Sequence, residues 1–421
     1  MSKPNLTLVS FSFVRGGAGI AAQNFFNLAN SFIDFEVNQI SQDDAGYFQL
    51  LKRVVSWFLG KFQRDGNPTK HSLNLFSYSK LIRVFQRNPD HLYHLHWINN
   101  DTLSVWDLDQ IPPFSLITLH DEWFYSGAEH YQMVGEDSRN FILGYSKKGS
   151  QRGLPWNYWI WKIKARQLQN RKDLHFTVPS QWMLERAKSS IVLKNNTIHY
   201  LPNSIDTDLF SPLNPKEYQI KRRDLGIGAH DFVISFGAID GTKNPLKGGN
   251  ALLEALSFWI TNKPANIRKR IVLLCFGGKI AAEFASLGVR IISTGFVKER
   301  THLAKIYAIS DVVLVPSLVE SFGQVAAEAM ACESPVVCFG TSGLTDIVTH
   351  AKNGWVAIPF SIESLAEKLE EAFQISPDER VVMGKNARRH VLDNFSISIV
   401  RDKYKKILEE MLELKKQDKT S

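Results

Sequence analysis

Two glutamates in the second half of the chain, Glu320 and Glu328, stand eight residues apart around the expected start of a helix. An apolar strand should end at Pro316, and the helix should open near Gly323 with Ser321 as its N-cap. Carboxylates accept hydrogen bonds from sugar hydroxyls, and the free amides of a first helical turn can hold phosphate or hydroxyl oxygens. The pattern suits a polyhydroxyl ligand. From these residues alone, however, Glu320 could be a helix-start charge and Glu328 a surface residue.

A glycine-rich turn and a lysine-bearing loop have the chemistry to receive an anion. Gly16 and Gly17 precede a helix expected over about residues 20–32, where glycine lets the backbone approach a ligand and the helix start favours negative charge. Lys243 and Lys247 flank a loop after an apolar strand and could clamp a pyrophosphate. A plain tight turn and a solvated lysine loop are the alternatives. Neither a G-x-G-x-x-G fingerprint nor a P-loop occurs, so a dinucleotide or ATP site is not indicated.

His120 and Asp121 follow the apolar end of another expected strand. His120 could orient a hydroxyl or share a proton, with Asp121 holding its ring, although a lone histidine at a strand end is more often structural. Upstream, His94 and His96 alternate with Leu95 and so share one face of a strand. A metal site there would need a third ligand that the sequence does not nominate.

Two stretches combine positive charge with apolar or aromatic side chains. Residues 47–64 predict a helix with apolar positions at helical spacing and lysine and arginine around them. Such a helix can lie in a lipid interface or cover the N-terminal sheet. Residues 139–172 interleave nine Lys/Arg with tryptophan and tyrosine, which suits nucleic-acid stacking, an anionic membrane rim or a solvated face. Because no recognisable RNA or DNA module accompanies this stretch, the membrane rim is favoured over nucleic acid.

The composition is that of a globular protein. The chain has 421 residues, 44% of them hydrophobic and 22% charged, which excludes disordered, collagen-like and multi-span membrane chains and favours two domains. The net charge of +8 points to an anionic partner. Because the two halves of the chain carry the same excess of positive charge, the charge alone does not identify which kind of partner it is. Three cysteines without zinc spacing and an N-terminus without an apolar signal segment predict reduced core thiols and a cytoplasmic location.

Apolar runs alternate with helix-length segments in both halves, which is typical of parallel sheets covered by helices on both faces. The sequence therefore predicts an α/β protein of two doubly wound domains. Prolines and asparagines interrupt the pattern between residues 201 and 212 and place the join there. We expect a first domain over residues 1–205, a second over 206–395, and a C-terminal helix with a charged tail over 396–421. Ligands of such sheets bind beyond the carboxyl ends of the strands, which for two facing domains means a cleft.

These motifs occur together in one family. The chain resembles the retaining glycosyltransferases of family 4, the glycogen-synthase-like GT-B enzymes that build bacterial cell-surface polysaccharides. The resemblance spans roughly residues 7–395 and is stronger in the second half. It is carried by Gly16-Gly17-Ala18-Gly19, His120-Asp121, Leu201-Pro202-Asn203-Ser204-Ile205-Asp206, Lys247-Gly248, the pair Glu320 and Glu328, Ser342-Gly343-Leu344 and Asn353-Gly354-Trp355.

The resemblance implies a GT-B fold, in which two Rossmann-like domains face a central cleft and C-terminal helices cross back to the first domain. It also implies that the second domain binds a nucleotide-sugar donor. Glu328 would hold the ribose hydroxyls and Glu320 the hydroxyls of the donor sugar, with the amides of Phe322 and Gly323 nearby. Lys247 would neutralise the diphosphate of the donor.

In the first domain, the same resemblance places Gly16 and Gly17 at the diphosphate and His120 beside the acceptor and the departing sugar. Asp121 and Trp123 fall on the acceptor side. No metal and no other cofactor is implied, because basic side chains and helix ends would stabilise the leaving diphosphate. Retention would proceed by front-side attack through an oxocarbenium-like state, so Glu320 is not assigned as a nucleophile despite the paired carboxylates.

One position departs from the family. An arginine usually follows the glycine that ends the first strand of the second domain, and here that position is Ala238. Lys243 is the candidate to supply the missing charge. The implied partners are a UDP- or GDP-hexose, a glycan or lipid-linked acceptor and an anionic membrane at the inner face of the cell, with no nucleic acid. A GT-B nucleotide-sugar epimerase and a non-enzymatic basic nucleic-acid binder are the competing classes.

Overall fold

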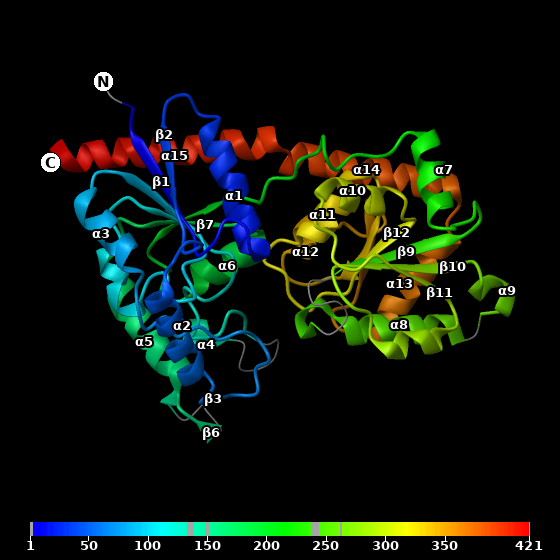
Figure 1. Ribbon diagram of the computed structural model, residues 1–421, viewed down its shortest axis with the longest axis horizontal. Coiled ribbons are helices and arrows are strands. Elements are labelled where there is room, and N and C mark those ends of the chain that lie inside the picture. The colour runs from blue at the N-terminus through cyan, green and yellow to red at the C-terminus, as the bar shows by residue number, and fades with distance from the viewer. Residues whose placement is uncertain (1–2, 133–138, 148–151, 238–243, 262, 421) are drawn as a thin grey trace. The chain divides into compact units, whose positions relative to one another are not determined.

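The computed structural model describes residues 3–132, 139–147, 152–237, 244–261 and 263–420 (Figure 1). The chain forms two compact units, the first made of Met1–Pro202 with Arg401–Ser421 and the second of Asn203–Val400. The last helix, α15 (Ile397–Thr420), begins in the second unit and continues into the first. The C-terminal helix therefore returns to the N-terminal unit, as the GT-B resemblance implies.

The first unit is built on a six-stranded parallel sheet. Its strands run in the order β2 (Glu36–Ile40), β1 (Asn5–Val9), β4 (Leu92–Leu95), β5 (Leu116–Thr118), β7 (His175–Val178) and β8 (Thr197–Tyr200). The inner strands are buried almost throughout, which is why continuous apolar runs predicted them. The edge strand β2 was not predicted, because it exposes most of its residues and carries a mixed polar sequence.

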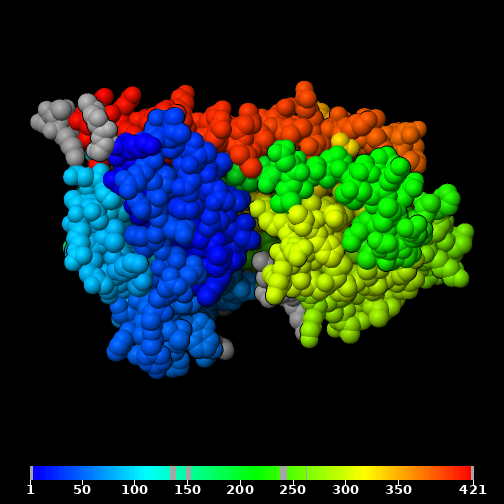
Figure 2. Space-filling model, turned by 45° about the horizontal axis from the view of Figure 1, so that its top comes forward, coloured from blue at the N-terminus to red at the C-terminus, as the bar shows by residue number. Residues whose placement is uncertain are grey.

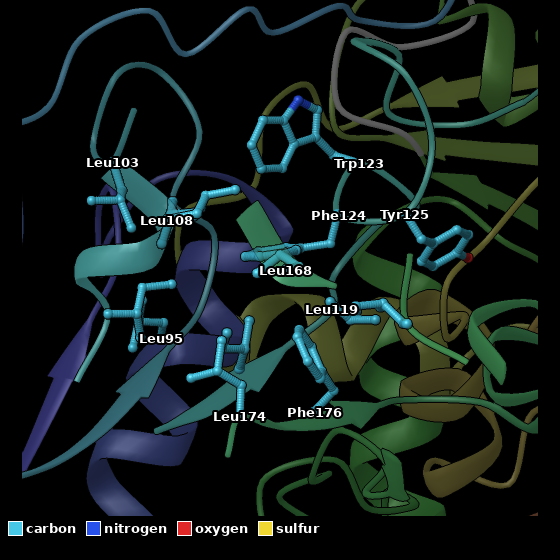
Figure 3. Close-up of a cluster of buried hydrophobic side chains, with 14 of the residues drawn as sticks. Leu95, Leu103, Leu108, Leu119, Trp123, Phe124, Tyr125, Leu168, Leu174 and Phe176 are labelled. Atoms are coloured by element: carbon cyan, nitrogen blue, oxygen red, sulfur yellow. The ribbon is translucent and has the colours of Figure 1, made fainter. Parts of the chain in front are cut away.

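Helices cover both faces of this sheet. On one face, α3 (Ser79–Arg87), α5 (Trp156–Leu168) and α6 (Gln181–Ser189) close the apolar cluster drawn in Figure 3. On the other, α1 (Gly16–Asn30) and α15 place Phe25 and Tyr404 against His94 of β4. The remaining elements are α2 (Tyr47–Gly60), α4 (Asn140–Leu143), the 3-10 helix η1 (Val105–Gln110) and the short antiparallel pair β3 (Gln63–Arg64) and β6 (Arg152–Gly153).

The second unit repeats the plan. Its parallel sheet runs in the order β11 (Arg290–Ser293), β10 (Ile271–Phe276), β9 (Phe232–Gly237), β12 (Val312–Val315), β13 (Val336–Phe339) and β14 (Gly354–Ala357). One face packs against α10 (Arg300–Ala308), α11 (Gln324–Ala331) and α14 (Pro377–Phe395), and the other against α8 (Gly249–Thr261) and α13 (Ile362–Gln374). The shorter elements are η5 (Pro245–Lys247), η6 (Ala282–Leu287), α7 (Pro215–Asp224), α9 (Ala265–Arg268) and α12 (Leu344–Ile347). The prediction of two doubly wound α/β units is confirmed.

The cysteines behave as the sequence predicts. Cys275, Cys332 and Cys338 are buried and free. Burial raises the pKa of the Cys275 and Cys338 thiols to about 12. These thiols are therefore protonated core residues. None of the helices in the described ranges combines the length and the hydropathy that crossing a membrane requires.

Candidate functional site

Lys247 and Glu320 lie 73 residues apart in the chain and meet in the second unit. Lys247 ends η5, and Glu320 lies in the loop after β12. Nζ of Lys247 lies 2.5 Å from Oε1 of Glu320, and Ser317 Oγ donates to the same oxygen at 2.8 Å. Both charged side chains are only partly buried. The structure thus brings together two of the predicted site residues in a pair that solvent, or a ligand, can reach.

The backbone at Gly248 explains why these two loops meet. The amide of Leu318 donates to the carbonyl of Leu246 at 2.9 Å, which ties the loop after β12 to η5. Gly248 has a left-handed φ of 70°, and a Cβ added there would lie 1.9 Å from the carbonyl oxygen of Pro316. Only glycine tolerates this approach. In the Lys-Gly pair, Lys247 therefore supplies the positive charge. Gly248, which has no side chain, lets this loop pack against the loop of Glu320.

A third loop, after β13, fixes the backbone of Glu320 on both sides. The amide of Glu320 donates to Ser342 Oγ at 2.9 Å, and the amide of Gly343 donates to the carbonyl of Glu320 at 2.9 Å. A Cβ on Gly343 would lie 2.6 Å from the carbonyl oxygen of Ser321, so glycine is again required. The carboxylate of Glu320 is therefore presented from a backbone that is held at both its N–H and its C=O.

The helix α11 opens next to Gly323, as the sequence predicts, but its N-cap differs from the predicted one. Its N-cap is Gly323, with φ 110°, rather than Ser321, because the chain must turn past Leu344 and Ile347, where a side chain would collide. The ring of Phe322 is buried against Phe395, with the ring centroids 5.3 Å apart. Phe322 can therefore offer a ligand only its backbone. The amides of residues 322 and 323 make no hydrogen bond with the rest of the described chain, as expected before a helix.

Glu328 is buried, so the alternative that it is a surface residue is wrong. Its Oε1 accepts from Arg300 Nη2 at 3.2 Å and from Gln324 Nε2 at 2.9 Å, and Oε2 accepts from the Tyr307 hydroxyl at 3.4 Å. Burial raises the pKa of Glu328, although these donors oppose the shift. Glu328 is thus a buried hydrogen-bond acceptor on the helix that follows the loop of Glu320.

Arg300 is a charged residue at this site that sequence reasoning missed. It opens α10, its guanidinium lies 5.0 Å from the centre of the Phe210 ring, and about a third of its side chain is exposed. No spacing in the sequence links it to Glu328, because α10 and α11 meet only through the packing of both helices on the same sheet face. The second unit therefore has a positive charge beside Glu328 as well as beside Glu320.

The glycine-rich turn of the first unit is the beginning of a helix. α1 starts at Gly16 with Arg15 as its N-cap, so the predicted start near residue 20 is wrong. Gly19 fills a packing role, since a Cβ there would lie 2.9 Å from the carbonyl oxygen of Ser12. Gly16 and Gly17 are exposed with open space on the Cβ side, which leaves their backbone approachable. Their assignment to a diphosphate stays a prediction.

Asp121 does not hold the ring of His120, contrary to the expectation from sequence. Its Oδ2 accepts from His130 Nδ1 at 2.6 Å and from Trp97 Nε1 at 2.8 Å, and Oδ1 accepts from the amide of Trp123 at 3.0 Å. Burial opposes its ionisation, but His130 and these donors hold the pKa of Asp121 below its usual value. The ring of His120 is held instead by His96, at 3.0 Å.

Trp123 is fully buried in the core of the first unit, so its ring is not exposed to an acceptor (Figure 3). Its assignment to the acceptor side stays a prediction. Its indole N–H donates to the carbonyl of Ser72 at 2.8 Å, and the ammonium of Lys164 lies 4.0 Å from the ring centre. The loop after β5 folds back, so that the rings of Trp123, Phe124 and Tyr125 complete the core.

Two positions singled out in the sequence, Ala238 and Lys243, lie outside the described residues, between the end of β9 and Asn244. The role of Lys243 as a substitute for the missing arginine stays a prediction. Within the described ranges, no three His, Cys, Asp or Glu side chains gather as metal ligands.

The sequence of the second unit is similar to that of known glycosyltransferases. Residues 244–390 match the family model for glycosyl transferases group 1. A D-inositol 3-phosphate glycosyltransferase from Kribbella flavida is 34% identical over 198 residues, which cover 44% of this chain and 45% of that protein. The chain spans about half the length of the curated relatives it matches.

Solved structures match over nearly the whole chain. Sucrose-phosphate synthase from Thermosynechococcus elongatus gives a TM-score of 0.66 at 19% identity, covering 98% of this chain and all of that one. Anabaena HepE gives a TM-score of 0.63 at 17% identity, covering 97% of this chain and all of that one. The chain therefore has the two-unit fold of the GT-B glycosyltransferases, and its second unit contains a segment that matches the glycosyl transferases group 1 family.

Proposed function

We propose that the protein is a retaining glycosyltransferase that moves a hexose from a UDP- or GDP-sugar to a hydroxyl of a glycan or lipid-linked acceptor in surface polysaccharide synthesis. The observation that carries this proposal is the contact between Lys247 and Glu320, held by three loops of the second sheet, with Glu328 on the following helix. The match to glycosyl transferases group 1 supports it, because the matched segment contains all three residues. Anabaena HepE, which shares the fold, has been solved with UDP and with UDP-glucose.

The proposed roles follow from charge and hydrogen-bonding capacity. The ammonium of Lys247, partly exposed beside Glu320, neutralises the charge that develops on the leaving diphosphate. Glu320 accepts hydrogen bonds from donor-sugar hydroxyls, and Glu328 accepts them from the ribose. The amides of residues 322 and 323, which bond to no other described residue, receive sugar or phosphate oxygens, and Gly16, Gly17 and Lys243 complete the diphosphate contacts. Basic side chains thereby take the place of a metal ion.

In the proposed reaction the acceptor hydroxyl attacks the anomeric carbon from the face that the diphosphate leaves. The bond from that carbon to the diphosphate oxygen breaks as the new glycosidic bond forms, and the hydroxyl proton passes to the leaving diphosphate. This geometry keeps the anomeric configuration without an enzymatic nucleophile. His120 lies beside the departing sugar as a neutral ring, because burial lowers its pKa to about 4.

The nucleotide can be identified by a thermal-shift screen of the wild-type protein against UDP, GDP, ADP and their common sugars. A donor at about 100 times its dissociation constant should stabilise the protein by about 2.7 kcal/mol. The best donor is then incubated with glycan, lipid-linked and inositol phosphate acceptors, the last because curated relatives carry that name. We expect a product with the donor's anomeric configuration.

Other outcomes of this screen would contradict the proposal. Conversion of the donor sugar to an epimer without transfer would indicate a nucleotide-sugar epimerase. No shift with any nucleotide, together with salt-sensitive binding of oligonucleotides, would indicate a nucleic-acid binder. An inverted product would exclude the retaining mechanism.

The surface of α2 supports peripheral association with an anionic membrane. Tyr47, Phe48 and Trp57 expose 75%, 81% and 62% of their surfaces (Figure 2 shows this part of the chain on the face of the first unit). Conversely, the polar residues Gln49 and Ser56 are buried, so the helix is attached by its polar side and does not cover the sheet with its apolar one. The stretch from residue 47 to 64 has four basic and no acidic residues, which complements anionic lipid.

The double substitution Phe48→Ser with Trp57→Ser should lower partition to phosphatidylglycerol-containing vesicles by about tenfold or more, since each aromatic ring contributes about 1.5–3 kcal/mol when it leaves water. Co-sedimentation measures the effect. The matched control is Val381→Ser with Val382→Ser on α14, two exposed apolar residues of the second unit, which should leave partition unchanged. Equal wild-type partition to phosphatidylcholine and phosphatidylglycerol vesicles would remove the electrostatic part of the proposal.

A further inference from the structure

Three histidines of the first unit, His94, His96 and His120, lie in contact where β4 and β5 end. The rings of His94 and His96 on and after β4 are 4.1 Å apart, and His96 Nδ1 lies 3.0 Å from Nε2 of His120. His94 and His96 are fully buried, whereas His120 is partly exposed. Burial, and for His94 and His96 also the neighbouring histidines, lowers the pKa of all three, to about 3 for His94 and about 4 for His120. All three rings are therefore neutral at neutral pH.

The hydrogen bonds of His94 are complete. Its Nδ1 lies 2.7 Å from the Tyr404 hydroxyl of α15, and its Nε2 lies 2.7 Å from Thr118 Oγ1, which in turn contacts Thr177 Oγ1 at 2.7 Å. Hydroxyls can donate or accept, so this part of the network satisfies either tautomer of His94. These hydrogen bonds hold His94 in place, but they do not determine which ring nitrogen of His120 carries the hydrogen.

His96 is different, because among the described residues only one of its ring nitrogens finds a partner. Nδ1 faces His120, while Nε2 is buried and makes no hydrogen bond with any described residue. A neutral imidazole carries one hydrogen. If that hydrogen were on Nε2, an N–H donor would be buried without an acceptor, and orphaned donors are the rarer and costlier case. The favoured tautomer has the hydrogen on Nδ1 of His96, where it donates to Nε2 of His120.

We infer that His96 is a positioning residue that fixes the tautomer of His120, so that His120 presents an Nδ1–H donor to an oxygen of the bound substrate and not a basic lone pair. Because its Nε2 accepts from His96, neutral His120 must carry its own hydrogen on Nδ1. The inference rests on the proposed function for the identity of that oxygen, a hydroxyl of the departing sugar or of the acceptor. It excludes His120 as the general base that deprotonates the acceptor.

Two nearly isosteric substitutions of His96 separate the alternatives. In His96→Asn, the side-chain amide can still donate to His120 from about the position of Nδ1. In His96→Asp, an ionised carboxylate can only accept, which forces the hydrogen of His120 onto Nε2 and favours its cationic form. We expect His96→Asn to keep kcat within about threefold of wild type and His96→Asp to lower kcat by about tenfold or more, the effect of one misplaced hydrogen bond. Equal kcat in the two variants, both folded by circular dichroism, would overturn the inference.

A spectroscopic measurement tests the tautomer without any activity. Nitrogen NMR of the wild-type protein labelled at histidine distinguishes protonated from bare ring nitrogens, and comparison with His120→Gln assigns the His120 signals. We expect a protonated Nδ1 and a bare Nε2 in His120, and the reverse pattern or a cationic ring in His96→Asp. A wild-type His120 protonated on Nε2 would overturn the inference even if sugar transfer were established. The expected pattern in a protein that transfers no sugar would leave the tautomer standing and refute the proposed function.

Discussion

Lys247→Ala should lower kcat/KM for sugar transfer by about 10²–10³-fold, the effect of removing one preorganised group that stabilises a developing anion. Lys247 is the cation that η5 delivers to the carboxylate of Glu320, and its partial exposure leaves the ammonium available to a diphosphate. A steady-state assay with the donor identified by thermal shift measures the loss. Affinity for the nucleoside diphosphate should fall in parallel, because the charge lost is the one proposed to face the phosphates.

The control is Lys216→Ala, at an exposed lysine near the start of α7 in the same unit, which should leave transfer unchanged. The fold should survive Lys247→Ala, because a partly solvated ion pair contributes at most about 1 kcal/mol. A folded Lys247→Ala variant with full activity would remove Lys247 from the site. Equal losses in both lysine variants would show that general surface charge, and not this contact, matters.

The sequence predicts Lys247 and Glu320 as site residues, but it does not predict the contact between them. Each was singled out by its own motif, a Lys-Gly pair and two spaced glutamates. What joins them is the fit of Gly248 against the carbonyl of Pro316 and the bond from Leu318 to Leu246. Such backbone approaches depend on the order of strands in the sheet, which no local pattern encodes.

The features that the sequence did not predict also depend on how the elements pack. Periodicity predicted the buried strands and missed the edge strands β2 and β14, the first because it is mostly exposed and the second because it is short and begins with glycine. The burial of the Trp123 ring in the core was not predicted either, because the exposure of a loop residue depends on how the loop folds. Arg300 and His96 escaped notice as partners of Glu328 and His120, because each acts across two elements that meet only in the folded unit.

Glu328→Gln should weaken nucleotide binding about tenfold or more at neutral pH, because an ionised carboxylate accepts from two ribose hydroxyls more strongly than an amide does. Burial raises the pKa of Glu328, so in the wild type its charge is lost as the pH falls through that raised value, and nucleotide affinity should fall with it. In Glu328→Gln this component of the pH dependence should be absent. Calorimetric titration of the nucleoside diphosphate across the acid range measures both effects.

The stability of the free protein supplies an independent check, because its pH dependence has the opposite sign. A carboxyl whose pKa is raised on folding binds its proton more tightly in the folded state, so its contribution to stability is present at low pH and is lost as the pH rises through the raised pKa. Glu328→Gln should remove that loss while keeping a partner near Arg300 and Tyr307. Wild-type nucleotide affinity that is flat with pH, alongside a stability that shows the Glu328 titration, would mean that the carboxylate is structural and that another group holds the ribose.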